Sequence, residues 1–311
     1  MNKKNLLRLS TVILFSIIFM YIGYENSSLI ENSKKNIKFL FKKIGLTESV
    51  FSSKSELKNI KEENKIETNN KIIIINGNSF DLSYEKILNF SERTAGVFLE
   101  YVDQKLSFDV YLQQGVNIKD NNVVELDLPL DIFFKKNGGV KSVLKIEGDS
   151  YAFISNKKAI DCYYSSIINL KNSKKIFSTD CLPDFDKADF NGLGGAYIEN
   201  EDYIFLTIGA PEWNSEKIRM LAQNASSKYG KILKFKKKSF FKKLISDEDY
   251  EIFSIGHKNP QGLVFNENKI FSVEHGPQGG DEINIILKNK NYGWPLVSYG
   301  TRYGDGKGFK K

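Results

Sequence analysis

Short apolar runs separated by polar clusters dominate the chain from residue 71 onward, and they restrict this part to an all-β fold. The runs are β-branched or aromatic, as in YIFLTIG at 203–209 and KIFSVEHG at 269–276, and clusters of Asn, Gly, Asp and Lys separate them. This rhythm is typical of strands joined by turns. Residues 216–225 alone have a helical pattern.

One hairpin pattern recurs: a small residue, three apolar residues, a polar turn and a second apolar strand. Clear copies begin at Gly195 and Gly262, and a looser copy covers residues 151–160. Four-stranded blades arranged around an axis produce recurring hairpins of this kind. We therefore expect a β-propeller, with a β-sandwich as the alternative.

The first 24 residues predict a membrane segment. Two Lys and one Arg precede residues 9–24, which carry no charge. This arrangement fits a signal peptide or an uncleaved signal anchor, and a buried core helix is a third reading. No small-residue cleavage pattern follows the run, so we favour a transmembrane anchor. The basic start would then stay cytoplasmic and place the rest of the chain on the periplasmic or extracytoplasmic side.

A polar linker, residues 25–70, separates this anchor from the predicted domain at 71–311. Its apolar island at 37–46 has Lys on both sides and could form part of a helical stalk or lie on an anionic membrane surface. Residues 1–70 hold 12 of the 45 Lys and Arg but 7 of the 38 Asp and Glu, so the predicted domain is nearly neutral. A nucleic-acid partner is therefore not expected, because DNA-binding modules concentrate basic residues where they touch phosphate.

The two cysteines, Cys162 and Cys181, stand nine residues on either side of Lys171 and Asn172 in the polar turn at 171–173. Two strands flank this turn, so the cysteines should face each other across a hairpin. In an oxidising compartment they could form a disulfide that contributes roughly 3 kcal/mol. Two free buried thiols are the other reading.

Three motifs in the last 60 residues carry a family resemblance: GHKNPQG at 256–262, EHGPQGGDEIN at 274–284 and NYGWP at 291–295. In this order and spacing they resemble the glucose/sorbosone dehydrogenase family of soluble aldose sugar dehydrogenases. The clear resemblance covers roughly residues 185–300. It implies a six-bladed β-propeller of which this chain covers only part, with the C-terminal blades missing.

The same resemblance implies an enzyme that oxidises a sugar hydroxyl by hydride transfer to pyrroloquinoline quinone, assisted by Ca²⁺. Gly276 and Pro277 match positions whose backbone carbonyls contact this calcium ion. Calcium prefers oxygen ligands, which such a turn can supply without a carboxylate. Asp281 and Glu282 match a segment that binds structural calcium in some members.

Cofactor contacts are implied for Lys258, Asn259 and Gln261. Asn259 and Gln261 match side chains that hydrogen-bond the quinone. Lys258 stands where the family usually has Arg, and this exchange keeps the positive charge but loses the planar guanidinium.

The catalytic base is the clearest departure from the family. Its usual His belongs to an HxGG phrase, and here Gly192 occupies that position, while Ala210 replaces the Asp that usually ends the following hairpin. The chain has two histidines, His257 and His275, and both belong to the motifs. His275 is the expected substitute base if the turn faces the cavity.

Two functions remain open at this stage. The first is a quinone-dependent oxidoreductase acting on the CH–OH group of a sugar. The second is a non-catalytic, membrane-anchored propeller that binds a sugar or another partner. The absent His favours the second function, and the cofactor-side motifs favour the first.

Overall fold

The computed structural model describes residues 67–75, 78–86, 96–101, 108–119, 122–159, 161–212, 214–303 and 305–309. The predicted membrane segment at 1–24 and the linker up to residue 66 lie outside these ranges. Within the described ranges, no helix is both long and apolar enough to cross a membrane.

The chain divides into two units, Met1–Asn89 and Phe90–Lys311. In the first unit, β1 (Glu67–Ile75) pairs antiparallel with β2 (Asn78–Lys86). β1 thus begins four residues before the predicted domain start at 71. The second unit holds the motifs and is described in the rest of this section.

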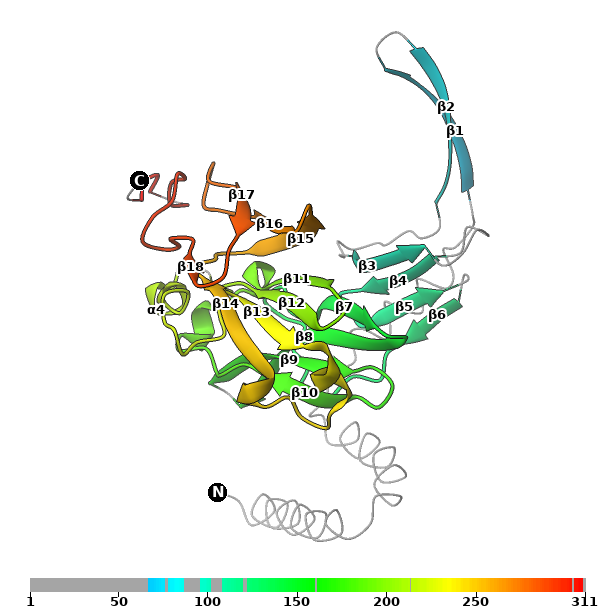
Figure 1. Ribbon diagram of the computed structural model, residues 1–311. Coiled ribbons are helices and arrows are strands. Elements are labelled where there is room, and N and C mark those ends of the chain that lie inside the picture. Colours follow the sequence, from blue (N-terminus) through cyan, green and yellow to red (C-terminus); the bar gives the residue numbers. More distant parts are fainter. Residues whose placement is uncertain are drawn as a thin grey trace, which may run out of the picture. The chain divides into compact units, whose positions relative to one another are not determined.

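Four sheets make up the described part of the second unit (Figure 1). The first contains β3 (Gly96–Tyr101), β4 (Phe108–Leu112), β5 (Val116–Lys119) and β6 (Asn122–Glu125). The second contains β7 (Val140–Ile146), β8 (Asp149–Ala159), β9 (Cys162–Asn169) and β10 (Lys174–Ser178). In both sheets, strands that follow each other in sequence are antiparallel neighbours.

The third and fourth sheets lie C-terminal to these. The third contains β11 (Gly194–Glu199), β12 (Tyr203–Ile208), β13 (Lys231–Lys236) and β14 (Tyr250–Ile255), and β18 (Lys290–Asn291) pairs parallel to β14. The fourth contains β15 (Pro260–Asn266), β16 (Lys269–Glu274) and β17 (Glu282–Ile286). The helices among the described residues of this unit are α4 (Glu216–Met220) and four 3₁₀ turns, η1 (Phe185–Lys187), η2 (Phe190–Gly192), η3 (Lys237–Phe241) and η4 (Asp247–Asp249).

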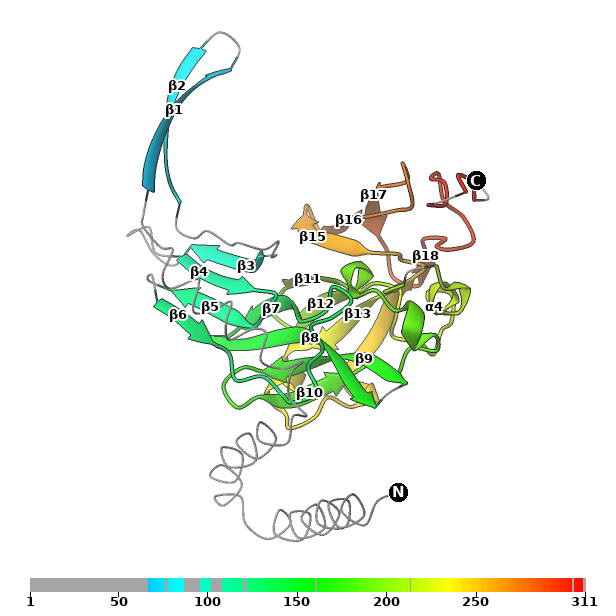
Figure 2. The same ribbon diagram turned by 180° about the vertical axis from the view of Figure 1, so that it is seen from behind.

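The first strands of successive sheets contact one another: β3 with β7, β7 with β11, and β11 with β15 (Figures 1 and 2). Each sheet therefore acts as a blade whose remaining strands lead away from this inner row, which is a propeller-like arrangement and not a sandwich. The small residue of the hairpin pattern serves this contact at Gly195. Its φ is +107°, and a Cβ would lie 3.2 Å from the Ser142 Cβ of β7.

Aromatic side chains fill the space between the second and third sheets. Phe177 lies edge-on to Phe235 at 5.1 Å and to Tyr250 at 5.4 Å between ring centroids, and Tyr151 lies edge-on to Phe240 at 5.2 Å. Such pairs add about 0.5–1.5 kcal/mol each beyond the area that they bury. These aromatic residues thus contribute to the packing between the two blades.

The two cysteines form a disulfide across the β9–β10 hairpin, with 5.0 Å between the Cα atoms of Cys162 and Cys181. The register pairs Asn169 with Lys174 and Ile168 with Lys175, which is the symmetry expected from the sequence. A bulge near Phe177 then shifts the pairing by one residue. This hairpin is therefore closed both by its strands and by a covalent bond.

Candidate functional site

A cavity of about 710 Å³ opens among the loops of the third and fourth blades and the C-terminal segment. Cavities of this size are typical of small-molecule sites. Polar, charged and aromatic side chains line it together with Gly192 and the turn at Gly276 and Pro277. The lining residues are Asp189, Asn191, Gly192, Glu212, Asn214, Arg219, Lys258, Asn259, His275, Gly276, Pro277, Trp294, Arg302, Tyr303, Asp305 and Phe309.

Lys258 and Asn259 reach the cavity from the loop between β14 and β15. The Asn259 side chain joins this loop to the third blade: its Oδ1 accepts from the Gly194 N–H at 3.1 Å, and its Nδ2 donates to the Asn191 carbonyl at 3.4 Å. Asn259 is buried, so these contacts fix its position. One amide thus links the inner strands of two blades at the cavity edge.

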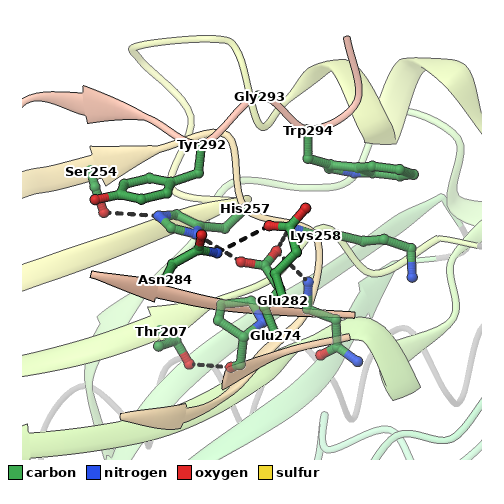
Figure 3. A network of polar contacts seen from close by, with 12 residues as sticks. Thr207, Ser254, His257, Lys258, Glu274, Glu282, Asn284, Tyr292, Gly293 and Trp294 are labelled. Carbon is green, nitrogen blue, oxygen red and sulfur yellow. Dashed lines mark hydrogen bonds and ion pairs between the residues drawn. The ribbon is translucent and has the colours of Figure 1, made fainter. Parts of the chain in front are cut away.

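Glu274, at the end of β16, holds this loop in place (Figure 3). Its Oε1 accepts from the backbone N–H groups of Lys258 and Asn259, the latter at 3.2 Å. Its Oε2 lies 2.9 Å from Nδ1 of His257. Glu274 is 3% exposed and His257 is fully buried. A buried carboxylate requires such donors, so the Glu of the second motif organises the backbone of the first.

His257 is a structural part of this network. Because the Glu274 carboxylate is an acceptor, Nδ1 donates to it, and Nε2, 2.9 Å from the Ser254 hydroxyl, accepts from that group. The Tyr292 ring of the third motif stacks on the imidazole, with 4.8 Å between centroids (Figure 3). All three motifs therefore meet at one buried histidine behind the cavity.

The Lys258 ammonium lies above aromatic rings, 5.6 Å from the centroid of Trp294 and 5.9 Å from that of Tyr303. Burial lowers the pKa of Lys258, while the carboxylates of Glu212, Glu274 and Asp281 act in the opposite direction. The cavity consequently presents a partly desolvated positive charge beside an indole.

The turn after β16 supplies His275, Gly276 and Pro277 to the cavity. A Cβ on Gly276 would lie 1.7 Å from the Gly280 carbonyl oxygen, so this turn requires glycine. The Gly276 N–H donates to Asp281 Oδ1 at 3.0 Å. His275 is largely exposed, and its Nδ1 lies 3.5 Å from Asp281 Oδ2.

Two residues expected at the site do not line the cavity. Gln261 is exposed on β15, where a bulge between Pro260 and Gly262 interrupts the pairing with β16. Glu282 lies on β17 opposite Glu274 and accepts from the Asn284 amide at 3.0 Å. Burial raises the pKa of Glu282, and the nearby Glu274 carboxylate contributes to the increase.

Gly192, which stands at the position of the family's usual base, lines the cavity. Glu212, which was not predicted from the sequence, also lines it. Glu212 follows β12 in the sequence GAPEWN, two residues after Ala210. Its side chain is 9% exposed. An acidic residue in the loop four residues after the end of β12 was the available signal.

Residues 157–311 match the model of the family described as Glucose / Sorbosone dehydrogenase. Aldose sugar dehydrogenase YliI of Escherichia coli is 38% identical over 130 residues, which are 39% of this chain and 32% of that protein. Quinoprotein glucose dehydrogenase B of Acinetobacter calcoaceticus is 54% identical over 48 residues, 15% of this chain and 10% of that one. The segment matched in sequence thus covers about a third of the length of the E. coli relative.

Solved structures resemble the fold. The apo-form of soluble aldose sugar dehydrogenase from Escherichia coli aligns with a TM-score of 0.54 at 24% identity, over 68% of this chain and 66% of that one. A glucose dehydrogenase aligns with a TM-score of 0.52 at 23% identity, over 69% of each chain. These likenesses agree with the propeller-like arrangement of the four blades.

Proposed function

Because residues 157–311 of this chain belong to the glucose/sorbosone dehydrogenase family, we propose that the protein oxidises the anomeric hydroxyl of an aldose with a quinone as hydride acceptor. One observation carries the proposal: the cavity gathers residues from all three motifs, with Lys258 from the first, Gly276 from the second and Trp294 from the third. The name of the Acinetobacter relative, a quinoprotein, supports the choice of a quinone.

The lining fits pyrroloquinoline quinone, a planar aromatic molecule with three carboxylates. Lys258, Arg219 and Arg302 bring positive charge to the cavity, and Trp294 and Phe309 provide aromatic surfaces. Cationic groups bind carboxylates and flat rings stack on flat ligands. We therefore propose that these side chains hold the cofactor.

Calcium would bind through backbone oxygens. No group of three His, Cys, Asp or Glu side chains among the described residues is placed to hold a metal ion. The Gly276–Pro277 turn lines the cavity and leaves no room for a Cβ at Gly276. Backbone carbonyls are ordinary calcium ligands, so we propose that this turn and the cofactor share the ion. Glu282 remains a candidate for a separate structural calcium site.

When bound, the quinone would supply the hydride acceptor for C1 of the sugar, and calcium would supply a Lewis acid beside it. The protein's part is to orient both molecules and to accept the hydroxyl proton. Asn259 and the Glu274 network hold the loop that presents Lys258. Gly192 has no side chain to accept a proton, so the candidate acceptors on the cavity wall include His275 and Glu212.

We expect pyrroloquinoline quinone with calcium to raise the melting temperature of the purified full-length protein. A ligand that binds only the folded state stabilises it by mass action, by about 2.7 kcal/mol at 100 times Kd. Thermal unfolding followed with and without the pair measures this effect. The shift should disappear when EDTA removes calcium.

A matched pair of lysine variants locates the binding. Lys258→Met should reduce the shift because it removes the ammonium from the cavity, whereas Lys269→Met, at an exposed position on β16, should leave it unchanged. If the quinone leaves the melting temperature of the unaltered protein unchanged at every calcium concentration, the cofactor assignment is wrong.

We also propose that the protein is anchored in the membrane with its blades on the extracytoplasmic side. The basic and apolar start of the chain motivates this placement, and so does the Cys162–Cys181 disulfide, because such bonds persist in oxidising compartments. Non-reduced protein from the membrane fraction should yield the linked peptides on mass spectrometry. A soluble, cytoplasmic protein with both thiols alkylated before reduction would contradict the proposal.

A further inference from the structure

The Glu212 carboxylate is a largely buried acid on the wall of the cavity, with 9% of its side chain exposed. Its Oε2 accepts from the Ser215 N–H at 2.8 Å, which fixes the orientation of the group. Its Oε1 lies 3.8 Å from Nη1 of Arg219, beyond hydrogen-bond distance. A backbone hydrogen bond from Asn214 also acts on this carboxylate. A carboxylate has about four lone-pair sites, so Oε1 keeps capacity to accept a hydrogen from a molecule in the cavity.

Glu212 belongs to the segment that faces Gly192. A Cβ built on Gly192 would lie 3.4 Å from the Ala210 carbonyl oxygen and 3.5 Å from the Pro211 Cα. A β-bridge between Ala188 and Glu212 and a hydrogen bond from the Asp189 N–H to the Pro211 carbonyl align the two segments. The absent side chain at 192 and the carboxylate at 212 consequently border the same part of the cavity.

We propose that Glu212 is the general base of this protein and takes over the role left vacant at Gly192. This inference rests on the proposed quinone-dependent function. The O–H bond of the anomeric hydroxyl breaks and its proton passes to Glu212 Oε1. The C1–H bond breaks at the same time, and its electron pair leaves with the hydrogen as hydride to the quinone. The sugar is thereby oxidised to the lactone and the quinone is reduced by two electrons.

The environment of Glu212 suits a proton acceptor. Burial raises its pKa, while the Ser215 N–H, Arg219 and Lys258 act in the opposite direction. A base is most effective when its pKa approaches the working pH. Arg219 of α4 and Lys258 of the β14–β15 loop are the charged groups that act on it, and Asp189 lines the cavity before η2.

The other acids and the histidine of the wall are less suited to this role. Asp189 Oδ1 accepts from both the Asn191 N–H and the Asn137 amide. Asp305 accepts from the Lys307 N–H and is exposed. His275 is 60% exposed and lies beside Asp281. Glu212 combines a low exposed fraction, an orientation fixed by the Ser215 N–H and an oxygen, Oε1, whose ion-pair partner Arg219 lies beyond hydrogen-bond distance.

The test compares Glu212→Gln with Glu216→Gln, an exposed carboxylate at the start of α4. With quinone, calcium, an aldose and a reducible dye, Glu212→Gln should lower kcat by 100- to 10,000-fold, the usual contribution of a general base. Its quinone-dependent thermal shift should persist, because the amide is isosteric. Glu216→Gln should match the unaltered protein in both measurements.

A second readout needs neither quinone nor sugar. A raised native pKa means that the stability contributed by Glu212 is present below its unfolded pKa, about 4.3, and is lost as pH rises through the native value. The melting temperature of Glu212→Gln relative to the unaltered protein should therefore rise as the pH increases from about 4. A carboxylate that served only as an ion-pair partner of Arg219 would make this difference fall.

The outcomes separate the two proposals. Turnover that survives Glu212→Gln within a few-fold overturns the base assignment and leaves the dehydrogenase function intact. Quinone binding without turnover in the unaltered protein also overturns it and favours a binding protein. Absence of the quinone-dependent shift in the unaltered protein overturns the proposed function, and the base assignment with it.

Discussion

Glu274→Gln should unfold at a temperature roughly 6–12 °C lower than the unaltered protein and should lose the quinone-dependent stabilisation. The carboxylate accepts from His257 and from two backbone N–H groups while being 3% exposed. An amide has one acceptor oxygen, and its two N–H donors would face the His257 and backbone N–H groups that now donate to the carboxylate. Removing one partner of a buried charged network costs about 3 kcal/mol or more, which corresponds to that shift for a domain of this size.

The control is Glu282→Gln, directly opposite Glu274 in the β16–β17 ladder. Burial and the neighbouring carboxylate raise the pKa of Glu282, so its charged form reduces stability at neutral pH. The amide should therefore leave the melting temperature unchanged or raise it in calcium-free buffer. Differential scanning calorimetry of both variants measures the two melting temperatures. Equal losses in the two variants would show that Glu274 has no special role in holding the loop.

The blades could be predicted from the sequence because their determinants are local. Short apolar runs such as β12 and β16 predict strands, and the symmetry about residues 171 and 172 predicts the β9–β10 pairing with its disulfide. The predicted helix at 216–225 shortens to α4, Glu216–Met220. The number of blades in a closed ring depends on packing between sheets, which no local pattern encodes, so six blades remain a prediction beside the four observed sheets.

Site residues that belong to a single motif on one loop could be predicted from the sequence. Residues whose role depends on contacts between distant segments could not. Lys258, Asn259 and Gly276 were expected at the cavity and line it. Gln261 was expected beside Asn259, but the bulge after Pro260 leaves it exposed.

The role of Glu274 was not predictable, because its partners at 257–259 belong to another motif. Glu212 was missed for a related reason. Its importance depends on the facing segment at Gly192, which lies 20 residues earlier. Such pairings become visible only when the chain is folded.

Gly192→His, introduced into the Glu212→Gln background, should restore turnover by about 100-fold or more. The backbone permits the change, because Gly192 lies in the 3₁₀ turn η2 and its Cβ would meet neighbours at ordinary contact distances of 3.4 Å and longer. By contrast, a Cβ on the nearby Gly209 would lie 2.1 Å from the Gly192 carbonyl oxygen. An imidazole at 192 would border the same space as Glu212 and has an ordinary pKa near 6.5, which suits a base at neutral pH.

The matched control for this rescue is Gly192→Gln in the same background. Glutamine also fills the position with a polar side chain and can hydrogen-bond, but it cannot take up a proton at neutral pH. Steady-state rates measured at several pH values should increase in the histidine variant as the imidazole loses its proton. The glutamine variant should show no such increase. Equal rates in the two variants would mean that position 192 does not border the reacting hydroxyl, and the placement of Glu212 beside it would lose its support.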